Sequence, residues 1–294
     1  MTPEPGGRRS TTAQGAPDPV RMGPAEAAIF ETFVVPRYLS LFGELLIDMV
    51  VESEQARVAH LHCRTGYPDR GLSLKLEGAH ILGADPSPAA LQLARAKAAT
   101  MPNMVAEYRV LDGLPTTLPA SAFSHAVAIH PLASQEDRDE LFAECARLLA
   151  PHGQALIAMP LRGSFQELGD LLQEYALKYD DAEVEQAVAR ATEARPTAEG
   201  LTEEVEQAGF EFVDVGERQA VLRFRSGRDF FEDPVARFLI LPEVKLHHRL
   251  EHAENALTYV RGAIDKYWSE GTFELTVHIG CVTGRRTAGP AQRQ

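Results

Sequence analysis

The sequence predicts an α/β fold in which helices cover both faces of a mostly parallel, doubly wound sheet. Short apolar runs, of the kind found in strands buried on both faces, recur along the chain, and segments with helical spacing of apolar residues separate them. Strands and helices that alternate in this order pair in parallel through right-handed crossovers. With 294 residues, 45% of them apolar, the chain is long enough for one elaborated domain, which we expect over 24–294.

Two segments precede the predicted sheet. Residues 1–23 are rich in Pro, Gly, Thr and Arg and lack the apolar core of a signal peptide, so we expect a disordered leader. Residues 24–56 carry apolar side chains at helical spacing and contain Pro36. Because proline has no amide hydrogen and clashes with the preceding turn, we expect two helices broken at Pro36.

The segment 57–160 predicts the first five strands with helices between them. The expected strands are 57–63, 79–85, 106–111, 123–129 and 154–159. Ser87 followed by Pro88 is an N-cap signal, and Ser134 with Asp137 resembles a capping box, so helices are expected to begin at both places.

The remaining chain predicts a helical segment, an insertion and the closing strands. Residues 163–209 read as helical with Gly209 as the stop signal, and 210–215 as a strand. The aromatic-rich, mostly helical insertion 226–269 is predicted either to lie over the ligand cleft as a lid or only to pack the outer helices. Residues 271–283 alternate cleanly and predict the closing strand.

Polar residues follow three of the predicted strands. Asp85, Asp112 and His130 all lie at carboxyl ends, the edge where open parallel sheets bind ligands. A histidine at the position of His130 can act as a general base on an O–H or N–H group. The alternative is a loop histidine bonded to backbone.

Composition limits the partners. The formal net charge is -13 and no broad basic cluster is present, so we expect a small-molecule or soluble protein partner rather than nucleic acid or a membrane. The oligomeric state is left open. Cys63, Cys145 and Cys281 are too few and too widely spaced for a disulfide framework, which favours a cytoplasmic location. His60, His62 and Cys63 lack outer ligands at motif spacing, so no metal site is expected.

The first strand, the turn at 64–66 and the second strand ending in Gly83-Ala-Asp85 resemble the class I S-adenosylmethionine (SAM) dependent methyltransferases, and the resemblance covers nearly all of the chain. It implies a Rossmann-like, seven-stranded sheet with an antiparallel closing strand. It also implies that Gly66 lies at the methionyl group, Asp85 at the ribose hydroxyls and Asp112 beside the adenine.

Several positions depart from the family pattern. His60 stands where the family has an acid, and His62 and Arg64 stand where it has two glycines, so that His62, Cys63 and Arg64 line an altered loop. The usual Phe-Asp that opens strand four is Phe123 followed by Ser124. The guanidinium of Arg64 is expected either to block the site or to reach outward. These changes predict SAM binding that is weak or lost.

Three functions follow. We favour a non-catalytic binding or regulatory protein, a pseudoenzyme with the methyltransferase fold and a degenerate SAM site. The alternative is an active SAM-dependent methyltransferase (a transferase acting on a small molecule), with His130 as its base. A third reading is a pocket for a different, anionic ligand held by Arg64. Sequences typical of phosphate-binding loops, HExxH metalloproteases and Gly-x-Ser-x-Gly hydrolases are missing.

Overall fold

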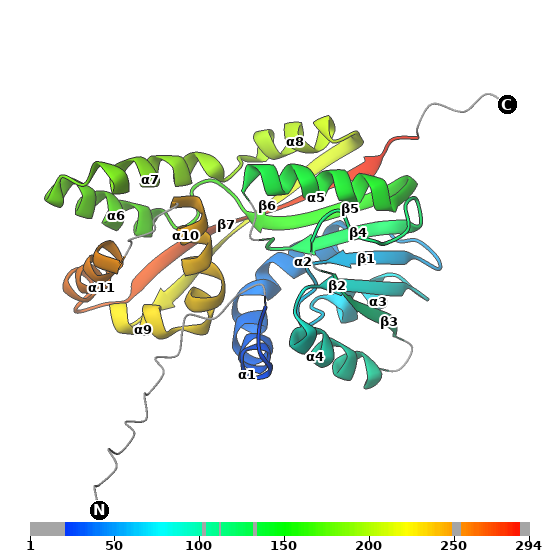
Figure 1. Ribbon diagram of the computed structural model, residues 1–294, viewed down its shortest axis with the longest axis horizontal. Helices are drawn as coiled ribbons and strands as arrows, with labels where there is room; N and C mark the ends of the chain where they lie inside the picture. Colours follow the sequence, from blue (N-terminus) through cyan, green and yellow to red (C-terminus); the bar gives the residue numbers. More distant parts are fainter. Residues whose placement is uncertain (1–20, 102–103, 112, 132–133, 249–253, 289–294) are drawn as a thin grey trace, which may run out of the picture.

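The computed structural model describes residues 21–101, 104–111, 113–131, 134–248 and 254–288 (Figure 1). A seven-stranded sheet crosses the molecule in the order β3-β2-β1-β4-β5-β7-β6. Its strands are β1 Arg57–Leu61, β2 His80–Asp85, β3 Val105–Val110, β4 Phe123–Ile129, β5 Leu149–Pro160, β6 Phe210–Phe224 and β7 Phe273–Arg286. Strands β1 to β5 pair in parallel, and β7 runs antiparallel to both β5 and β6. The predicted fold class is therefore confirmed.

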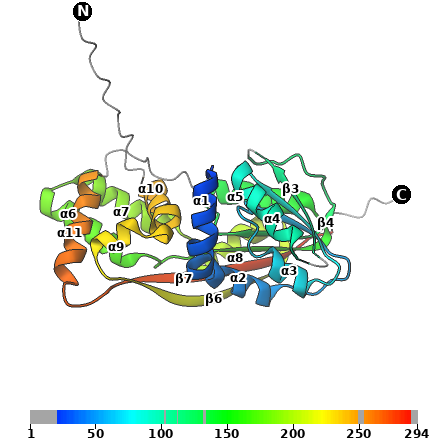
Figure 2. The ribbon, with the colours of Figure 1, turned by 90° about the horizontal axis from the view of Figure 1, so that it is seen from below.

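Helices cover both faces of the sheet. They are α1 Pro24–Ile29, η1 Phe30–Leu39, α2 Ser40–Met49, α3 Asp69–Lys75, α4 Pro88–Ala99, α5 Gln135–Leu148, α6 Gln166–Tyr179, α7 Ala182–Ala194, α8 Ala198–Gln207, α9 Gly227–Glu232, η2 Ala236–Ile240, α10 Leu241–His248 and α11 Glu254–Tyr267. Figures 1 and 2 show α6, α7, α9, α10 and α11 gathered at the end of the molecule opposite β3. None of these helices is long and apolar enough to cross a bilayer, as far as the described residues go.

The central strands are apolar on both faces because both faces are covered. Val58 and Val127 belong to the core cluster under the N-terminal helices, whereas their neighbours Ala59 and Ala126 belong to the cluster under α5 and α8. All four side chains are fully buried. This two-sided burial explains why these strands appear in the sequence as continuous apolar runs.

The predicted helix starts are present. Ser87 accepts a hydrogen bond from the Ala90 amide at 3.3 Å, with Pro88 in the first helical position of α4. Ser134 and Asp137 cap each other at the start of α5. The stop signal at Gly209 adopts a φ of 89°, a left-handed conformation that glycine reaches without steric cost.

The predicted break at Pro36 is wrong. Helical structure runs without a gap from Pro24 to Met49, and Pro36 lies inside the ten-residue π-helical segment η1. A π-helix bonds each carbonyl to the amide five residues on, so a proline does not interrupt the same set of bonds as in an α-helix. The local widening therefore accommodates Pro36.

The predicted end of β6 at residue 215 is also wrong. β6 continues to Phe224 and pairs with β7 along its whole length: Phe210 lies opposite Arg286, and Phe224 lies opposite Phe273. β5 pairs only with residues 279–285 of β7. The outer half of β6 and β7 is thus a two-stranded ribbon, and it carries the insertion. The Phe230 ring lies 5.0 Å from that of Phe224 and 5.8 Å from that of Phe273.

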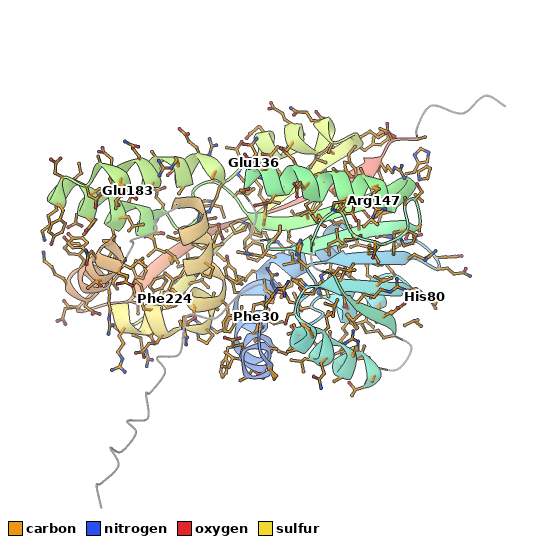
Figure 3. All side chains as sticks on the ribbon, viewed as in Figure 1. Phe30, His80, Glu136, Arg147, Glu183 and Phe224 are labelled. Atoms are coloured by element: carbon orange, nitrogen blue, oxygen red, sulfur yellow. The ribbon has the colours of Figure 1, made fainter. Side chains whose placement is uncertain are left out.

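The insertion also reaches the strand ends. The Phe238 ring in η2 lies 5.7 Å from the ring of Phe30 in η1. In Figure 3, Phe30 lies on the N-terminal helical segment, between the sheet and the insertion. Aromatic residues of the insertion therefore pack both on the ribbon and on the segment beside the cleft.

Candidate functional site

The candidate site lies where the strand order reverses. β1 is flanked by β2 on one side and β4 on the other, so the connections after β1 and β4 diverge to opposite faces of the sheet. Open α/β sheets bind ligands in the crevice at the carboxyl ends of such strands. In this chain the crevice is bounded by the residues after Leu61 and after Ile129.

The loop that leaves β1 keeps the backbone shape of a glycine-rich turn. His62, Arg64 and Gly66 have φ values of 52°, 48° and 78°. Only Gly66 adopts such a conformation without a steric penalty, which is about 1–2 kcal/mol for a residue with a Cβ atom. The two altered positions are therefore strained, and other contacts must hold them in place.

Arg64 reaches inward across the crevice. Its Nη1 donates to the carbonyl oxygen of Ile129 at 2.8 Å, and its Nη2 donates to that of His130 at 2.7 Å. The guanidinium carbon lies 5.8 Å from the centre of the Phe30 ring, and only 7% of the residue is exposed. Burial lowers the pKa of Arg64, while Asp85 raises it. The side chain thus joins the β1 loop to the end of β4.

Asp85 holds the same loop from the other side. Its Oδ2 accepts the Arg64 amide at 2.9 Å, and its Oδ1 accepts the Ser87 amide at 2.9 Å. Burial raises the pKa of Asp85, and these backbone donors and the Arg64 charge lower it. Ser87 in turn donates to the carbonyl of Met22, so the chain before α1 lies over the end of β2. Both carboxylate oxygens therefore have backbone partners.

His130 lies in a buried network behind Arg64. The Tyr38 hydroxyl is 3.0 Å from its Nε2, and Oε2 of Glu243 is 3.4 Å from the same nitrogen. Arg195 Nε donates to Oε1 of Glu243 at 2.7 Å. Tyr38 and His130 have no exposed surface. Burial raises the pKa of both Tyr38 and Glu243, with Glu243 adding to the shift of Tyr38 and Arg195 opposing that of Glu243.

A second buried network surrounds His60, the β1 residue that departs from the family pattern. Nδ1 of His60 lies 2.6 Å from Oδ1 of Asp69, and the Tyr108 hydroxyl donates to Oδ2 of Asp69 at 2.7 Å. His60 is 1% exposed, and Asp69 has no exposed surface. A Cβ atom at Gly66 would meet the Tyr108 hydroxyl at 3.0 Å and Oδ2 of Asp69 at 3.2 Å. Asp69, at the start of α3, thus joins His60 on β1 to Tyr108 on β3.

His62 is expected to make the fold acid-sensitive. Burial and the neighbouring Arg64 charge lower its pKa from 6.5 to about 4. The unfolded chain therefore binds a proton more readily than the folded chain, and stability falls as the pH falls from about 6.5 to about 4. We expect the unfolding free energy of the wild-type chain to fall between pH 7 and pH 4 by about 1–3 kcal/mol more than that of His62→Gly. Denaturation of both proteins at the two pH values measures this difference.

The glycine also relieves the left-handed backbone, but that gain does not depend on pH. His152→Gly, at another position with positive φ, controls for it. Parallel pH profiles for wild type and His62→Gly would contradict the assignment.

The predicted site residues are brought together in part. Arg64 contacts both Asp85 and the carbonyl of His130, whereas Gly66 lines a neighbouring pocket of about 290 Å³ with Tyr108. Asp112 lies outside the described residues. Cys63 is 2% exposed, and burial raises its thiol pKa. Within the described ranges, no group of three His, Cys, Asp or Glu side chains is placed to hold a metal ion.

Sequence reasoning missed the residues that close the crevice from distant segments. Phe30 and Tyr38 come from η1, Arg195 from the end of α7, and Glu243 from α10. No spacing rule joins positions so far apart.

Arg64 and Asp85 already have protein partners at the switch point, where this fold binds ligands. A methionyl tail at the switch point needs the space that the Arg64 side chain fills, and its positive sulfur would meet a guanidinium instead of a carboxylate. Ribose hydroxyls would have to share Asp85 with two backbone amides. Arg64 and Asp85 thus hold the β1 loop against the ends of β2 and β4.

Comparison with known proteins gives one family and a shared fold. Residues 60–157 match the family model described as a methyltransferase domain. No curated protein matches the chain in sequence.

Solved structures share the architecture at low identity. The Bacillus halodurans C-125 protein BH2331, described as a candidate methyltransferase, is 14% identical with a TM-score of 0.54, covering 84% of this chain and 99% of that one. Haemonchus contortus phosphoethanolamine N-methyltransferase 2, solved with phosphomonomethylethanolamine and S-adenosylhomocysteine, is 15% identical with a TM-score of 0.53, covering 89% and 57%. The 4+2 cyclase SpnF is 16% identical with a TM-score of 0.50, covering 85% and 81%. These likenesses show the fold alone.

Proposed function

We propose that this chain, which carries the class I methyltransferase fold with a methyltransferase domain at residues 60–157, is a non-catalytic binding protein with a degenerate SAM site. The family-level resemblance indicated by the sequence is confirmed. The loss of the cofactor site is our proposal. It concerns the closed crevice at the ends of β1 and β4.

The single observation that carries the proposal is the position of Arg64. Its guanidinium makes two hydrogen bonds to carbonyls at the end of β4, across the crevice in which this fold binds ligands. Phe30, fully buried, packs against the guanidinium from η1. A ligand that takes this place must first displace the side chain and leave both carbonyls without their donor.

The size of that cost argues against SAM. Hydrogen bonds involving a charged group contribute about 1.5–3 kcal/mol each, so opening the two Arg64 bonds costs about 3–6 kcal/mol. Since 1.4 kcal/mol is a factor of ten, the apparent affinity falls by roughly 10²–10⁴ relative to a preformed site. A site that would otherwise bind with a Kd of about 1 μM then binds with a Kd of about 0.1–10 mM.

We expect titration calorimetry of the wild-type chain with SAM and with S-adenosylhomocysteine to show no saturable binding up to about 0.1 mM, where the binding free energy is about 5.5 kcal/mol. Thermal unfolding should be equally unaffected by either ligand. A midpoint that rises steadily with ligand concentration would mean that the crevice opens, and it would favour an active methyltransferase.

The alternatives make different use of the same residues. In an active small-molecule methyltransferase, Arg64 swings outward, Gly66 and Asp85 contact SAM, and Asp85→Ala weakens its binding. In the anionic-ligand reading, Arg64 keeps its inward position and pairs with a carboxylate or phosphate. Binding of such an anion, lost in Arg64→Gly and accompanied by no response to SAM, would select that reading.

A further inference from the structure

A second cavity lies at the opposite end of the molecule from β3. Helices α6 and α11 lie side by side there, as both Figure 1 and Figure 2 show. Between them opens a groove of about 510 Å³, a volume within the range of small-molecule sites. Tyrosines from both helices line it: Tyr175, Tyr179, Tyr259 and Tyr267. The groove belongs to the helical cluster and shares no residue with the crevice.

The tyrosine rings are held in place before any ligand arrives. Glu174 accepts a hydrogen bond from the Tyr259 hydroxyl at 2.5 Å and another from the Tyr267 hydroxyl. The Tyr175 ring lies 4.8 Å from the Tyr179 ring and 5.5 Å from the Tyr259 ring. Rings fixed by one carboxylate and by each other lose little freedom when a flat ligand packs against them.

Two ammonium groups set the charge of the groove. Lys178 Nζ lies 4.9 Å from the centre of the Tyr259 ring, and Lys266 Nζ lies 4.8 Å from that of Tyr267. Among the described residues the lining contains these two lysines and no Asp or Glu. Glu174 lies beside it on the Tyr259 and Tyr267 hydroxyls, and its negative charge offsets part of that of the lysines, which leaves a net positive charge. Tyrosine cages without lysines suit quaternary ammonium ligands. Here the lysines would repel a cation and attract an anion.

Gly262 provides an independent observation. It lies in the interior of α11, where glycine lowers helix stability relative to alanine. Its φ is not positive, and a Cβ atom built on it would meet nothing within 4 Å. Neither backbone conformation nor packing therefore requires a glycine. Gly262 lines the groove, so a side chain at this position would extend into it.

We propose that this groove binds a small aromatic acid. The aromatic part lies in the groove at Gly262 against the tyrosine rings, and the anionic group pairs with Lys178 and Lys266. The proposal is independent of the proposed function, because SAM titration measures binding at the crevice, whereas binding at this groove is measured with a different ligand.

The test uses 2-naphthoate as the anionic aromatic probe and 2-naphthamide as its uncharged counterpart. Calorimetric titration of the full chain is expected to show saturable binding of 2-naphthoate and at least about tenfold weaker binding of the amide. Gly262→Leu fills the groove and should weaken 2-naphthoate binding at least about tenfold, with no lowering of the thermal midpoint, because leucine favours the helix. Lys178→Met/Lys266→Met should also weaken it about tenfold.

Gly169→Ala is the matched control, since Gly169 is a helix-interior glycine of α6 that does not line this groove. It should bind 2-naphthoate as the wild type does. No saturable binding of 2-naphthoate would overturn the proposal. Equal affinity in Gly262→Leu would overturn the location, and equal affinity for acid and amide would overturn the role of the lysines.

Discussion

Arg64→Gly is expected to create measurable SAM and S-adenosylhomocysteine binding, with an affinity at least about 100-fold above that of the wild-type chain. The variant removes the side chain that joins the β1 loop to the carbonyls of Ile129 and His130, and it removes a positive charge from beside the ligand's sulfur. It also places glycine at a φ of 48°, where the backbone conformation no longer carries a steric penalty. Calorimetry with both ligands measures the gain.

Arg64→Ala separates space from backbone strain, because alanine opens the same volume and keeps the left-handed penalty. It should bind more weakly than the glycine variant and more strongly than wild type. Arg64→Lys keeps the charge and should remain close to wild type. Circular dichroism must first show that each variant is folded. If the folded glycine variant binds SAM no better than the wild-type chain, Arg64 is not what closes the site.

Asp69→Ala is expected to lower the free energy of unfolding by about 3–5 kcal/mol, the range for removing one member of a buried charged or hydrogen-bonded pair. Both His60 and the Tyr108 hydroxyl lose their partner in the variant, and His60 is only 1% exposed. Denaturation in urea at pH 7 measures the change through the transition midpoint and slope.

Asp48→Ala serves as the control for removing a carboxylate. Asp48 pairs with Arg218 on the surface, with side-chain exposures of 64% and 43%, so its loss should cost less than about 1 kcal/mol. A double-mutant cycle with His60→Ala and Asp69→Ala should give a coupling energy on the order of 1–3 kcal/mol. A cost for Asp69→Ala no larger than that of Asp48→Ala would show that the buried network contributes nothing to stability.

The sequence predicted the sheet well because its signals are local. Continuous apolar runs, the caps at Ser87 and Ser134 and the stop at Gly209 each lie within a few residues of the element they define. Pro36 was misread because a proline's effect depends on the hydrogen-bond pattern around it, and the π-helical pattern is not visible in the sequence. The continuation of β6 to Phe224 depends on pairing with β7, which lies some fifty residues further on.

In the candidate site, too, the residues with local signals could be predicted, and those placed by long-range contacts could not. Arg64, His62 and Asp85 could be found because they occupy positions that a turn and a strand end define. Whether Arg64 turned inward or outward depended on its acceptors at Ile129 and His130, which the sequence does not place beside it. The contacts of Tyr38 and Glu243 with His130 join three distant segments, so only the folded chain brings them together.

The widened helical segment η1 has a consequence for how the crevice is sealed. Each residue of a π-helix advances the side-chain direction by roughly a quarter of a turn, so deleting one residue between Phe30 and Tyr38 would turn these two rings out of their present alignment by about that angle. Phe30 now lies over the guanidinium and Tyr38 faces His130. The number of residues in this segment therefore determines which aromatic side chains face Arg64 and His130. We expect a chain shortened here to keep its fold but to lose these two contacts.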